Sequence, residues 1–192
     1  MDSIYKSLVE IVGEGYVSNQ PEELYLYSRD PGTMEPHVPD YVVAPKTTEE
    51  VQEIVKLANR EKVPIVPWGG GLSLAGLVIP LRGGIAVDLK RMDRIIEVNE
   101  KARYVVLEGG VSHGKLVSYL QRHHPNLRHS IPESPPQSTI VGNVVIHGQG
   151  DLTQVYGCNS DMVNGLEVVL PTGEAGKIGS CSHSPYWFGR AP

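Results

Sequence analysis

Apolar side chains recur at three- and four-residue spacing in three segments, residues 2–13, 47–60 and 113–122. Each segment therefore presents one continuous apolar face if it is helical. Thr47, followed by Glu50 three residues later, forms a capping box at the start of the second segment, and Ser112 is the expected N-cap of the third. The pattern predicts three amphipathic helices, over residues 2–13, 47–60 and 113–122.

Shorter apolar runs, bounded by Pro and Gly, have the length and composition of strands. A tight turn at 171–174 joins the last two of them. The predicted strands are 41–44, 63–66, 85–88, 95–98, 103–108, 162–170 and 175–178. Residues 28–40 contain three prolines and are expected to be an extended surface segment. The expected fold class is therefore α+β, with two small lobes and a glycine-rich seam between them.

Residues 125–160 contain few regular signals and are rich in Pro, Gly, Ser, Asn and His. A loop region of that length inside a domain is uncommon and is usually functional. The chain also holds 21 Gly and 15 Pro. The glycines cluster between strand-like runs, which indicates backbone that turns tightly or approaches something closely.

The 17 basic and 22 acidic residues give a net charge of −5, which disfavours a nucleic-acid or membrane-surface partner. No apolar run approaches the roughly 20 residues of a membrane helix, and we expect no transmembrane segment and no secretory signal. The two cysteines, Cys158 and Cys181, suit a reducing compartment. A reducing compartment predicts a cytoplasmic protein. Neither cysteine has a second Cys at metal-ligand spacing, so we expect no metal site.

The segment from Trp68 to Gly76 is the sharpest local feature, since successive glycines after a strand can turn several backbone N–H groups toward one anion. A Walker loop needs Lys and Ser/Thr after its final Gly, and this loop continues with Leu77-Val78. A dinucleotide fingerprint starting at Gly69 would require Gly where Leu74 stands. Both alternatives fail, which leaves a phosphate-binding nest or a hairpin without a ligand.

The second feature is the segment 130–143, which prolines stiffen and which offers hydroxyls and free N–H groups to a ligand. Gly142 would let the backbone approach a ring closely. Taken alone, the segment is equally consistent with a rigid surface loop.

Together the two segments resemble the FAD-binding domain of the superfamily of vanillyl-alcohol oxidase and p-cresol methylhydroxylase (PCMH), to which the glycolate oxidase flavin subunit and D-lactate dehydrogenases belong. The first half of the motif includes Pro67-Trp68-Gly69-Gly70-Gly71-Leu72-Ser73 and Gly76. The second includes Ile131-Pro132-Glu133, Gly142-Asn143, Gly148 and the stretch 165–174. The resemblance implies an N-terminal segment over 1–40, a first FAD-binding lobe over 41–100 and a second over 101–192, incomplete at its C-terminus.

The resemblance also implies roles for individual residues. The loop 69–73 would hold the FAD pyrophosphate, the segments 132–134 and 138–143 would line the flavin and ribityl chain, and Val168 would meet the adenine half through its backbone. The cofactor-binding residues expected are Pro67, Trp68, Gly69, Gly70, Gly71, Leu72, Ser73, Gly76, Pro132, Glu133, Ser134, Ser138, Thr139, Gly142, Asn143, Gly148 and Val168.

Several positions depart from the family pattern or bear on catalysis. Leu72 stands where members with covalent flavin carry His, which predicts non-covalent FAD at this lobe. Glu133 falls where phenol-oxidising members place an acid near flavin N5, although a solvated loop glutamate explains it equally well. Asp151 replaces a tyrosine that some phenol oxidases use. His129 and His147 flank the expected cradle, either as contacts to flavin or substrate or, as we expect, as hydrogen-bonded structural histidines, and the other five are expected at the surface.

The resemblance implies a flavin-dependent oxidoreductase that moves a hydride from an alcohol or a 2-hydroxy acid, such as glycolate or lactate, to FAD. A non-catalytic FAD-binding or scaffold subunit of an electron-transfer complex is the main alternative. An aryl-alcohol or cresol-type dehydrogenase and the flavin-dependent cell-wall reductase of UDP-N-acetylenolpyruvoylglucosamine remain further alternatives. Family members continue well past this length, so a partner subunit or a C-terminal portion is expected to supply the substrate site.

Overall fold

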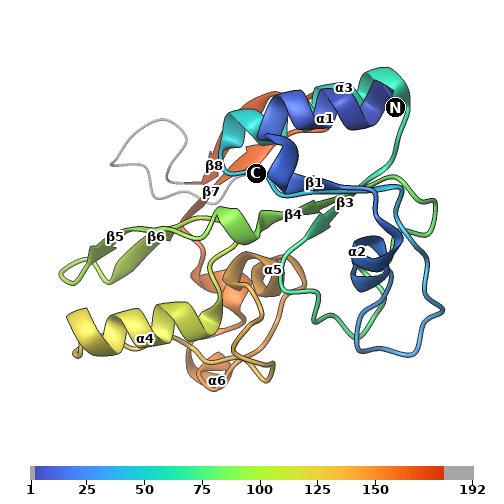
Figure 1. Ribbon diagram of the computed structural model, residues 1–192. Coiled ribbons are helices and arrows are strands. Elements are labelled where there is room, and N and C mark those ends of the chain that lie inside the picture. The colour runs from blue at the N-terminus through green and yellow to red at the C-terminus, as the bar shows by residue number, and fades with distance from the viewer. Residues whose placement is uncertain (1–2, 180–192) are drawn as a thin grey trace.

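The computed structural model describes residues 3–179, so Cys181 and His183 lie outside the described residues. Its central sheet has the strand order β1-β2-β4-β3 (Figure 1). Strands β2, β4 and β3 are parallel, and β1 is antiparallel to β2. The carboxyl ends of the three parallel strands therefore meet at one edge of the sheet. The bounds are β1 Val17–Ser18, β2 Tyr41–Val43, β3 Ile65–Trp68 and β4 Ile85–Asp88.

Helices cover both faces of this sheet. On one face, α1 (Ser3–Val12) and α3 (Thr48–Glu61) bury Leu8 and Ile54 against Val43 and Ile85, all four of them fully. On the other face, Leu24 of α2 (Pro21–Leu26) packs with Val42 and Ala86. Neighbouring strand residues alternate between the two faces because successive side chains of a strand point in opposite directions.

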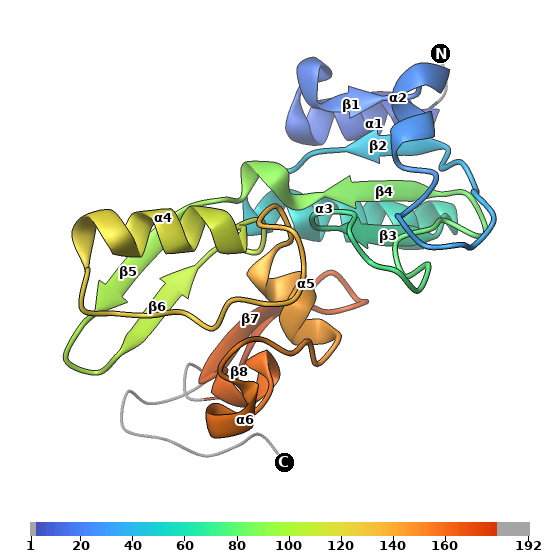
Figure 2. The same ribbon diagram turned by 90° about the horizontal axis from the view of Figure 1, so that it is seen from below.

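A second core lies between a hairpin and a helix. Strands β5 (Ile95–Asn99) and β6 (Tyr104–Leu107) are antiparallel, and α4 (His113–His123) packs alongside them (Figure 2). The buried residues of this core are Val111, Leu116 and Leu120, with the side chains of both strands packed around them.

A second antiparallel hairpin, β7 (Gly165–Val169) and β8 (Ala175–Gly179), is anchored on α3. Gln52 Nε2 donates a hydrogen bond of 2.8 Å to the carbonyl of Gly173, and Asn59 Nδ2 donates one of 2.5 Å to the carbonyl of Pro171. The turn between the two strands is therefore fixed by helix side chains. The remaining short elements are η1 Glu14–Tyr16, η2 Leu89–Arg91, α5 Ile140–Val145, α6 Thr153–Tyr156 and η3 Asn159–Met162.

The predicted helices and strands are present, with two corrections at their ends. The strand expected from residue 162 begins at Gly165, because residues 159–162 form a 3-10 turn. The strand expected over 63–66 runs from Ile65 to Trp68. The sequence pattern missed β1, α2, α5 and α6, which are too short to show a period, and the last two lie inside the region 125–160 that was expected to be a loop.

The segment 28–40 is only partly the surface segment that its prolines suggested. Ser28, Asp30 and Pro39 are buried in it. Within this segment, Asp30 accepts backbone hydrogen bonds from Gly32 in its own turn and from Gly76 at the end of the glycine loop (residues 69–76).

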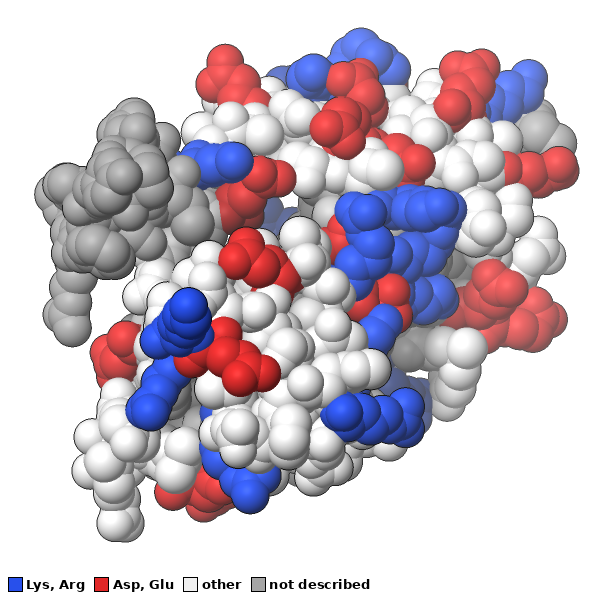
Figure 3. Space-filling model, turned by 90° about the vertical axis from the view of Figure 1, so that its left-hand side faces the viewer, with Lys and Arg blue, Asp and Glu red and all other residues white. Residues whose placement is uncertain are grey.

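Charged side chains of both signs are interspersed on the face shown in Figure 3, where several basic ones gather near the middle. Among residues 3–179, no helix combines the length and apolar character needed to cross a membrane.

Candidate cofactor site

The glycine loop begins where β3 ends, at the carboxyl edge of the parallel strands. Trp68 closes the strand, is buried, and packs edge-on against Tyr27 with ring centroids 4.8 Å apart. Gly71 follows with φ of 66°, and a Cβ there would lie 2.5 Å from the Trp68 ring. The third glycine is therefore required by its left-handed backbone and by the indole behind it.

The glycine loop lies directly against the segment 130–143, the second feature that the sequence singled out. A Cβ on Gly70 would lie 2.7 Å from the carbonyl oxygen of Gln137, and a Cβ on Gly69 would overlap the Thr139 hydroxyl. Side chains at these positions would push the two segments apart. The fold thus brings together the two segments that the sequence singled out separately.

The loop keeps backbone donors unused. Within the part of the chain that the structure describes, the N–H groups of Gly70, Gly71 and Leu72 donate to no protein acceptor. Gly70 is exposed, whereas Gly71 and Leu72 are partly exposed. Several free N–H groups in one turn containing a left-handed glycine are the arrangement that binds phosphate oxygens.

The facing segment is ordered by its own hydroxyls. The hydroxyl of Thr139 is the N-cap of α5 and accepts a hydrogen bond of 3.3 Å from the Gly142 N–H. The Ser134 and Ser138 hydroxyls lie 2.9 Å apart, and Ser138 also donates to the carbonyl of Pro135 at 2.8 Å. These bonds hold small polar groups beside the glycine loop without bulky side chains between them.

Asn143 joins this segment to the chain that follows it. Its side-chain oxygen accepts a hydrogen bond from Asn159 Nδ2, and both side chains are buried. The Gly148 N–H donates to the Asn143 carbonyl at 2.8 Å, and a Cβ on Gly148 would overlap the Asn143 amide. Asn143 and Gly148 are therefore tightly packed together.

Glu133 projects from the same segment into solvent. Its neighbour Pro132 is buried and pairs with Gly150 in an isolated bridge. Asp151 holds this part of the loop, because its Oδ1 accepts a hydrogen bond of 2.8 Å from the Ile131 N–H. The exposed Glu133 side chain is compatible with both interpretations of the sequence, an acid beside the cofactor and a solvated loop residue.

Two histidines behind this segment form a pair. His113 Nδ1 lies 2.7 Å from His129 Nε2, and the rings stack with centroids 4.9 Å apart. Burial lowers the pKa of His113 to about 4 and also lowers the pKa of His129. Among the described residues, His113 Nε2 has no partner. The neutral tautomer with the proton on Nδ1, donating to His129, therefore leaves only an acceptor unpaired.

The sequence placed His113 at the surface, and this was wrong. His113 is the first residue of α4 and is 2% exposed, because its backbone N–H donates to the Ser138 carbonyl and draws the first turn inward. His129 and His147 are hydrogen bonded to His113 and Ser160 respectively, as a structural role requires.

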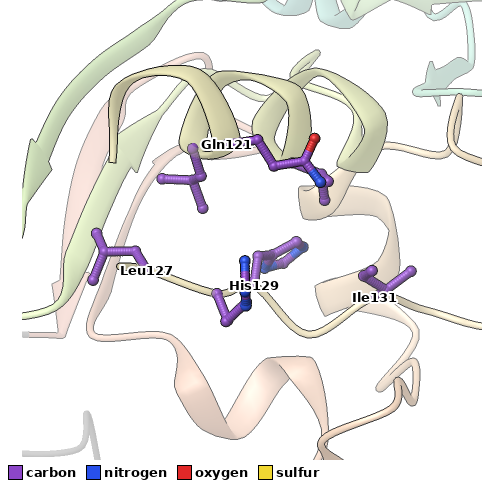
Figure 4. Close-up of a pocket in the computed structure, with 7 residues that line it drawn as sticks. Gln121, Leu127, His129 and Ile131 are labelled. Atoms are coloured by element: carbon purple, nitrogen blue, oxygen red, sulfur yellow. The ribbon is translucent and has the colours of Figure 1, made fainter. Parts of the chain in front are cut away.

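A cavity of about 240 Å³ lies between α4 and the segment 127–131 (Figure 4). Its walls are mainly apolar, and Gln121 and His129 contribute polar groups to it. None of the expected cofactor-binding residues lines this cavity.

Val168 lies apart from the glycine loop, on β7, where it pairs with Gly176 of β8. Gly76 has φ of 71° and donates its N–H to Asp30 Oδ2 at 2.8 Å. The sequence singled out Gly76 but not Asp30, the residue that holds it. The only signal for Asp30 was its spacing to Gly32, which is typical of a side chain that accepts a nearby backbone hydrogen bond.

Comparison with known proteins follows the same segments. Residues 39–179 match the family model of the FAD binding domain. The chain is similar to a mitochondrial D-lactate dehydrogenase [cytochrome] of Arabidopsis thaliana, with 31% identity over 177 residues, 91% of this chain and 30% of that protein. It is also similar to the glycolate oxidase subunit GlcD of Bacillus subtilis, with 29% identity over 180 residues, 92% of this chain and 37% of that subunit.

Among solved structures, p-cresol methylhydroxylase with substrate bound superimposes with a TM-score of 0.85 and 29% identity. The match covers 98% of this chain and 38% of that one. The fold is therefore the α+β fold of PCMH-type FAD-binding domains, and the chain spans roughly a third of the length of these relatives.

Proposed function

Because the chain belongs to the FAD binding domain family, we propose that it holds FAD non-covalently and serves a flavin-linked dehydrogenase or oxidase acting on a 2-hydroxy acid or another alcohol. The observation that carries the proposal is the set of unused N–H donors at Gly70, Gly71 and Leu72, on an exposed to partly exposed loop that lies against the segment 137–139. A pyrophosphate needs converging donors of this kind.

Each segment of the proposed site would contact a different part of the cofactor. The loop 69–73, closed by Gly76, would hold the pyrophosphate through its backbone. Ser134, Ser138 and Thr139 would lie beside the ribityl chain and the ring, while Gly142 leaves room for a flat group. The backbone of Val168 would contact the adenine half, as the C-terminal end of the site.

Held by these residues, FAD would supply the acceptor for a hydride from the carbon–hydrogen bond of the substrate. Glu133 is the proposed catalytic residue, because its carboxylate is exposed on the segment proposed to line the flavin. Leu72 offers no nucleophile for a bond to the flavin, which is the basis for non-covalent binding.

The substrate class rests on the relatives. A D-lactate dehydrogenase and a glycolate oxidase subunit, about 30% identical over nine-tenths of this chain, act on 2-hydroxy acids. We therefore place a glycolate- or lactate-like substrate first. Its contacts would come from residues outside this chain, in a C-terminal portion or a partner subunit, and this chain would supply the FAD-binding part of the assembly.

A phenol or aryl alcohol is the second candidate. Two phenol-converting proteins, p-cresol methylhydroxylase and 4-ethylphenol oxidase, superimpose with TM-scores of 0.85 and 0.83 at 29% identity. Against this candidate, Asp151 stands at the position of a tyrosine used by some phenol oxidases, and its carboxylate is bonded to the Ile131 backbone.

The division of the chain into lobes and the location of the protein are also proposals. We place a first lobe over 41–100 and a second over 101–192, after the N-terminal segment 1–40. We also place the protein in the cytoplasm, on the argument that its two cysteines suit a reducing compartment.

The test is the visible absorption spectrum of the purified chain with and without added FAD, repeated after acid precipitation. Flavin absorbance that stays with the protein on gel filtration and moves to the supernatant in acid supports non-covalent binding. A chain that remains colourless in excess FAD contradicts the proposal, and flavin that stays in the acid pellet contradicts the non-covalent part. Anaerobic bleaching of the bound flavin by D-lactate, glycolate or 4-ethylphenol, measured after reconstitution with the C-terminal portion or partner subunit, then separates the substrate classes.

A further inference from the structure

The glycine loop is fixed at its far end by a single buried carboxylate. Asp30 is 8% exposed and accepts two backbone hydrogen bonds, from the Gly32 N–H to Oδ1 at 2.9 Å and from the Gly76 N–H to Oδ2 at 2.8 Å. One carboxylate thus ties its own turn to the end of the loop. Hydrogen bonds to an ionised acceptor are about twice as strong as neutral ones.

The same turn braces the loop by contact. The Cα of Gly32 lies so close to the loop that a Cβ there would be 2.5 Å from the carbonyl oxygen of Leu74. Met34 touches the loop a little further on, because a Cβ on Gly76 would overlap its sulfur. The segment 30–34 therefore packs against residues 74–76 and restricts the conformation of their backbone.

The two ends of the loop are consequently held while its middle stays unbonded. Trp68 anchors the beginning in the sheet, and Asp30 anchors Gly76. Between them, the N–H groups of Gly70, Gly71 and Leu72 have no acceptor among the described residues. A loop fixed at both ends presents its donors without first losing the conformational freedom of an open loop, and such preorganisation strengthens binding.

We propose that Asp30 is a positioning residue for pyrophosphate binding, which acts by clamping the Gly32 and Gly76 N–H groups and never touches the cofactor. This inference rests on the proposed binding of FAD pyrophosphate at the loop 69–73. A carboxylate near an anion site would by itself repel the ligand. Removing the charge of Asp30 should therefore weaken FAD binding if Asp30 clamps the loop, and strengthen FAD binding if repulsion is its only effect.

The test compares Asp30→Asn with a matched control, Asp40→Asn. Asp40 Oδ2 also accepts a hydrogen bond from a glycine N–H, that of Gly84, at 2.6 Å. That contact lies at the amino ends of β2 and β4, whereas the glycine loop follows the carboxyl end of β3. The control therefore removes the charge from a carboxylate that accepts the same kind of bond, at the opposite edge of the sheet.

The affinities of the full 192-residue chain for FAD and for ADP are measured by fluorescence titration and competition, with the melting temperature recorded for every variant. Asp30→Asn is expected to raise both Kd values about tenfold, the effect of one lost charge-assisted hydrogen bond. Asp40→Asn is expected to lower the melting temperature without changing either Kd. Unchanged or tighter FAD binding by Asp30→Asn overturns the clamp.

A measurement on the wild type covers the case in which Asp30→Asn does not fold. Amide hydrogen exchange should show the Gly76 N–H protected in the free protein and the N–H groups of Gly70 to Leu72 unprotected until FAD is added. Rapid exchange at Gly76 contradicts the clamp even if FAD binds. A wild-type chain that binds neither FAD nor ADP contradicts the proposed function instead, whatever the exchange at Gly76 shows.

Discussion

The Cα of Gly69 lies against the hydroxyl of Thr139, although the two residues belong to separate segments of the chain. Thr139 caps α5 with that same hydroxyl, which accepts from the Gly142 N–H. The end of β3 and the start of α5 are therefore in direct contact, and this contact joins the two halves of the proposed FAD site.

Replacing Gly69 by Ala is expected to weaken FAD binding about tenfold, because the new Cβ overlaps the Thr139 hydroxyl and pushes the two segments apart. Fluorescence titration with FAD measures the effect. The control is Gly15→Ala, where a Cβ meets nothing within 4 Å. Equal FAD affinity of the two variants would show that the contact between the segments is not needed for binding.

The cap of α3 is expected to contribute about 1 kcal/mol to the free energy of unfolding. The Thr47 hydroxyl accepts a hydrogen bond of 3.2 Å from the Glu50 N–H, which otherwise has no acceptor at this helix end. Thr47→Ala should lower the free energy of unfolding, measured by urea titration, by that amount. Thr48→Ala, which removes only an exposed bond to Glu167, should change stability by less than about 0.5 kcal/mol.

Tyr27 and Asp88 are expected to be coupled in stability and in pH dependence. The Tyr27 hydroxyl donates to Asp88 Oδ2 at 2.6 Å, and burial together with the Asp88 charge raises the pKa of Tyr27 from 10.0 to about 12. The bond contributes fully below pH 10 and is lost as the pH rises through about 12.

Tyr27→Phe should therefore destabilise the protein by about 1.5–3 kcal/mol at neutral pH and by less at alkaline pH. Urea unfolding at both pH values measures the difference. Tyr25→Phe is the control, since the Tyr25 side chain is 51% exposed. A loss that is the same at both pH values would contradict the coupling to tyrosine ionisation.

The buried His113 predicts acid sensitivity. Its folded-state pKa of about 4 lies below the ordinary histidine value of 6.5, so in this window the unfolded chain binds more protons than the folded one. Stability should therefore fall as the pH drops from 6.5 to about 4, by at most about 1.4 kcal/mol per pH unit for this histidine.

His113→Asn should remove part of this slope, whereas substitution of the exposed His123 by Asn should leave it unchanged. The free energy of unfolding, measured by urea titration at several pH values, gives both slopes. If His113→Asn and the wild type lose stability in parallel on acidification, then the pKa of His113 is the same in the folded and unfolded states, and its burial has no role in acid unfolding.

Local signals were sufficient to predict most of the regular elements. Thr47 with Glu50 and Ser112 before α4 are capping patterns that act within a few residues, and the structure shows both hydroxyls accepting the expected N–H groups. The same locality explains why α2 and β1 were missed. Elements this short depend on the sheet that they pack against, and that sheet forms from distant residues.

The candidate site divides in the same way. The sequence by itself determined the composition of each segment: three glycines after a strand, hydroxyl residues between prolines, and a chain that resembles a known FAD-binding domain. Only the tertiary structure decided that Gly69 lies against Thr139, that Asp30 holds Gly76, and that His113 is buried beside His129. The physical reason is that propensities and caps act over a few residues, whereas these three contacts join segments that meet only when the sheet and helices have packed.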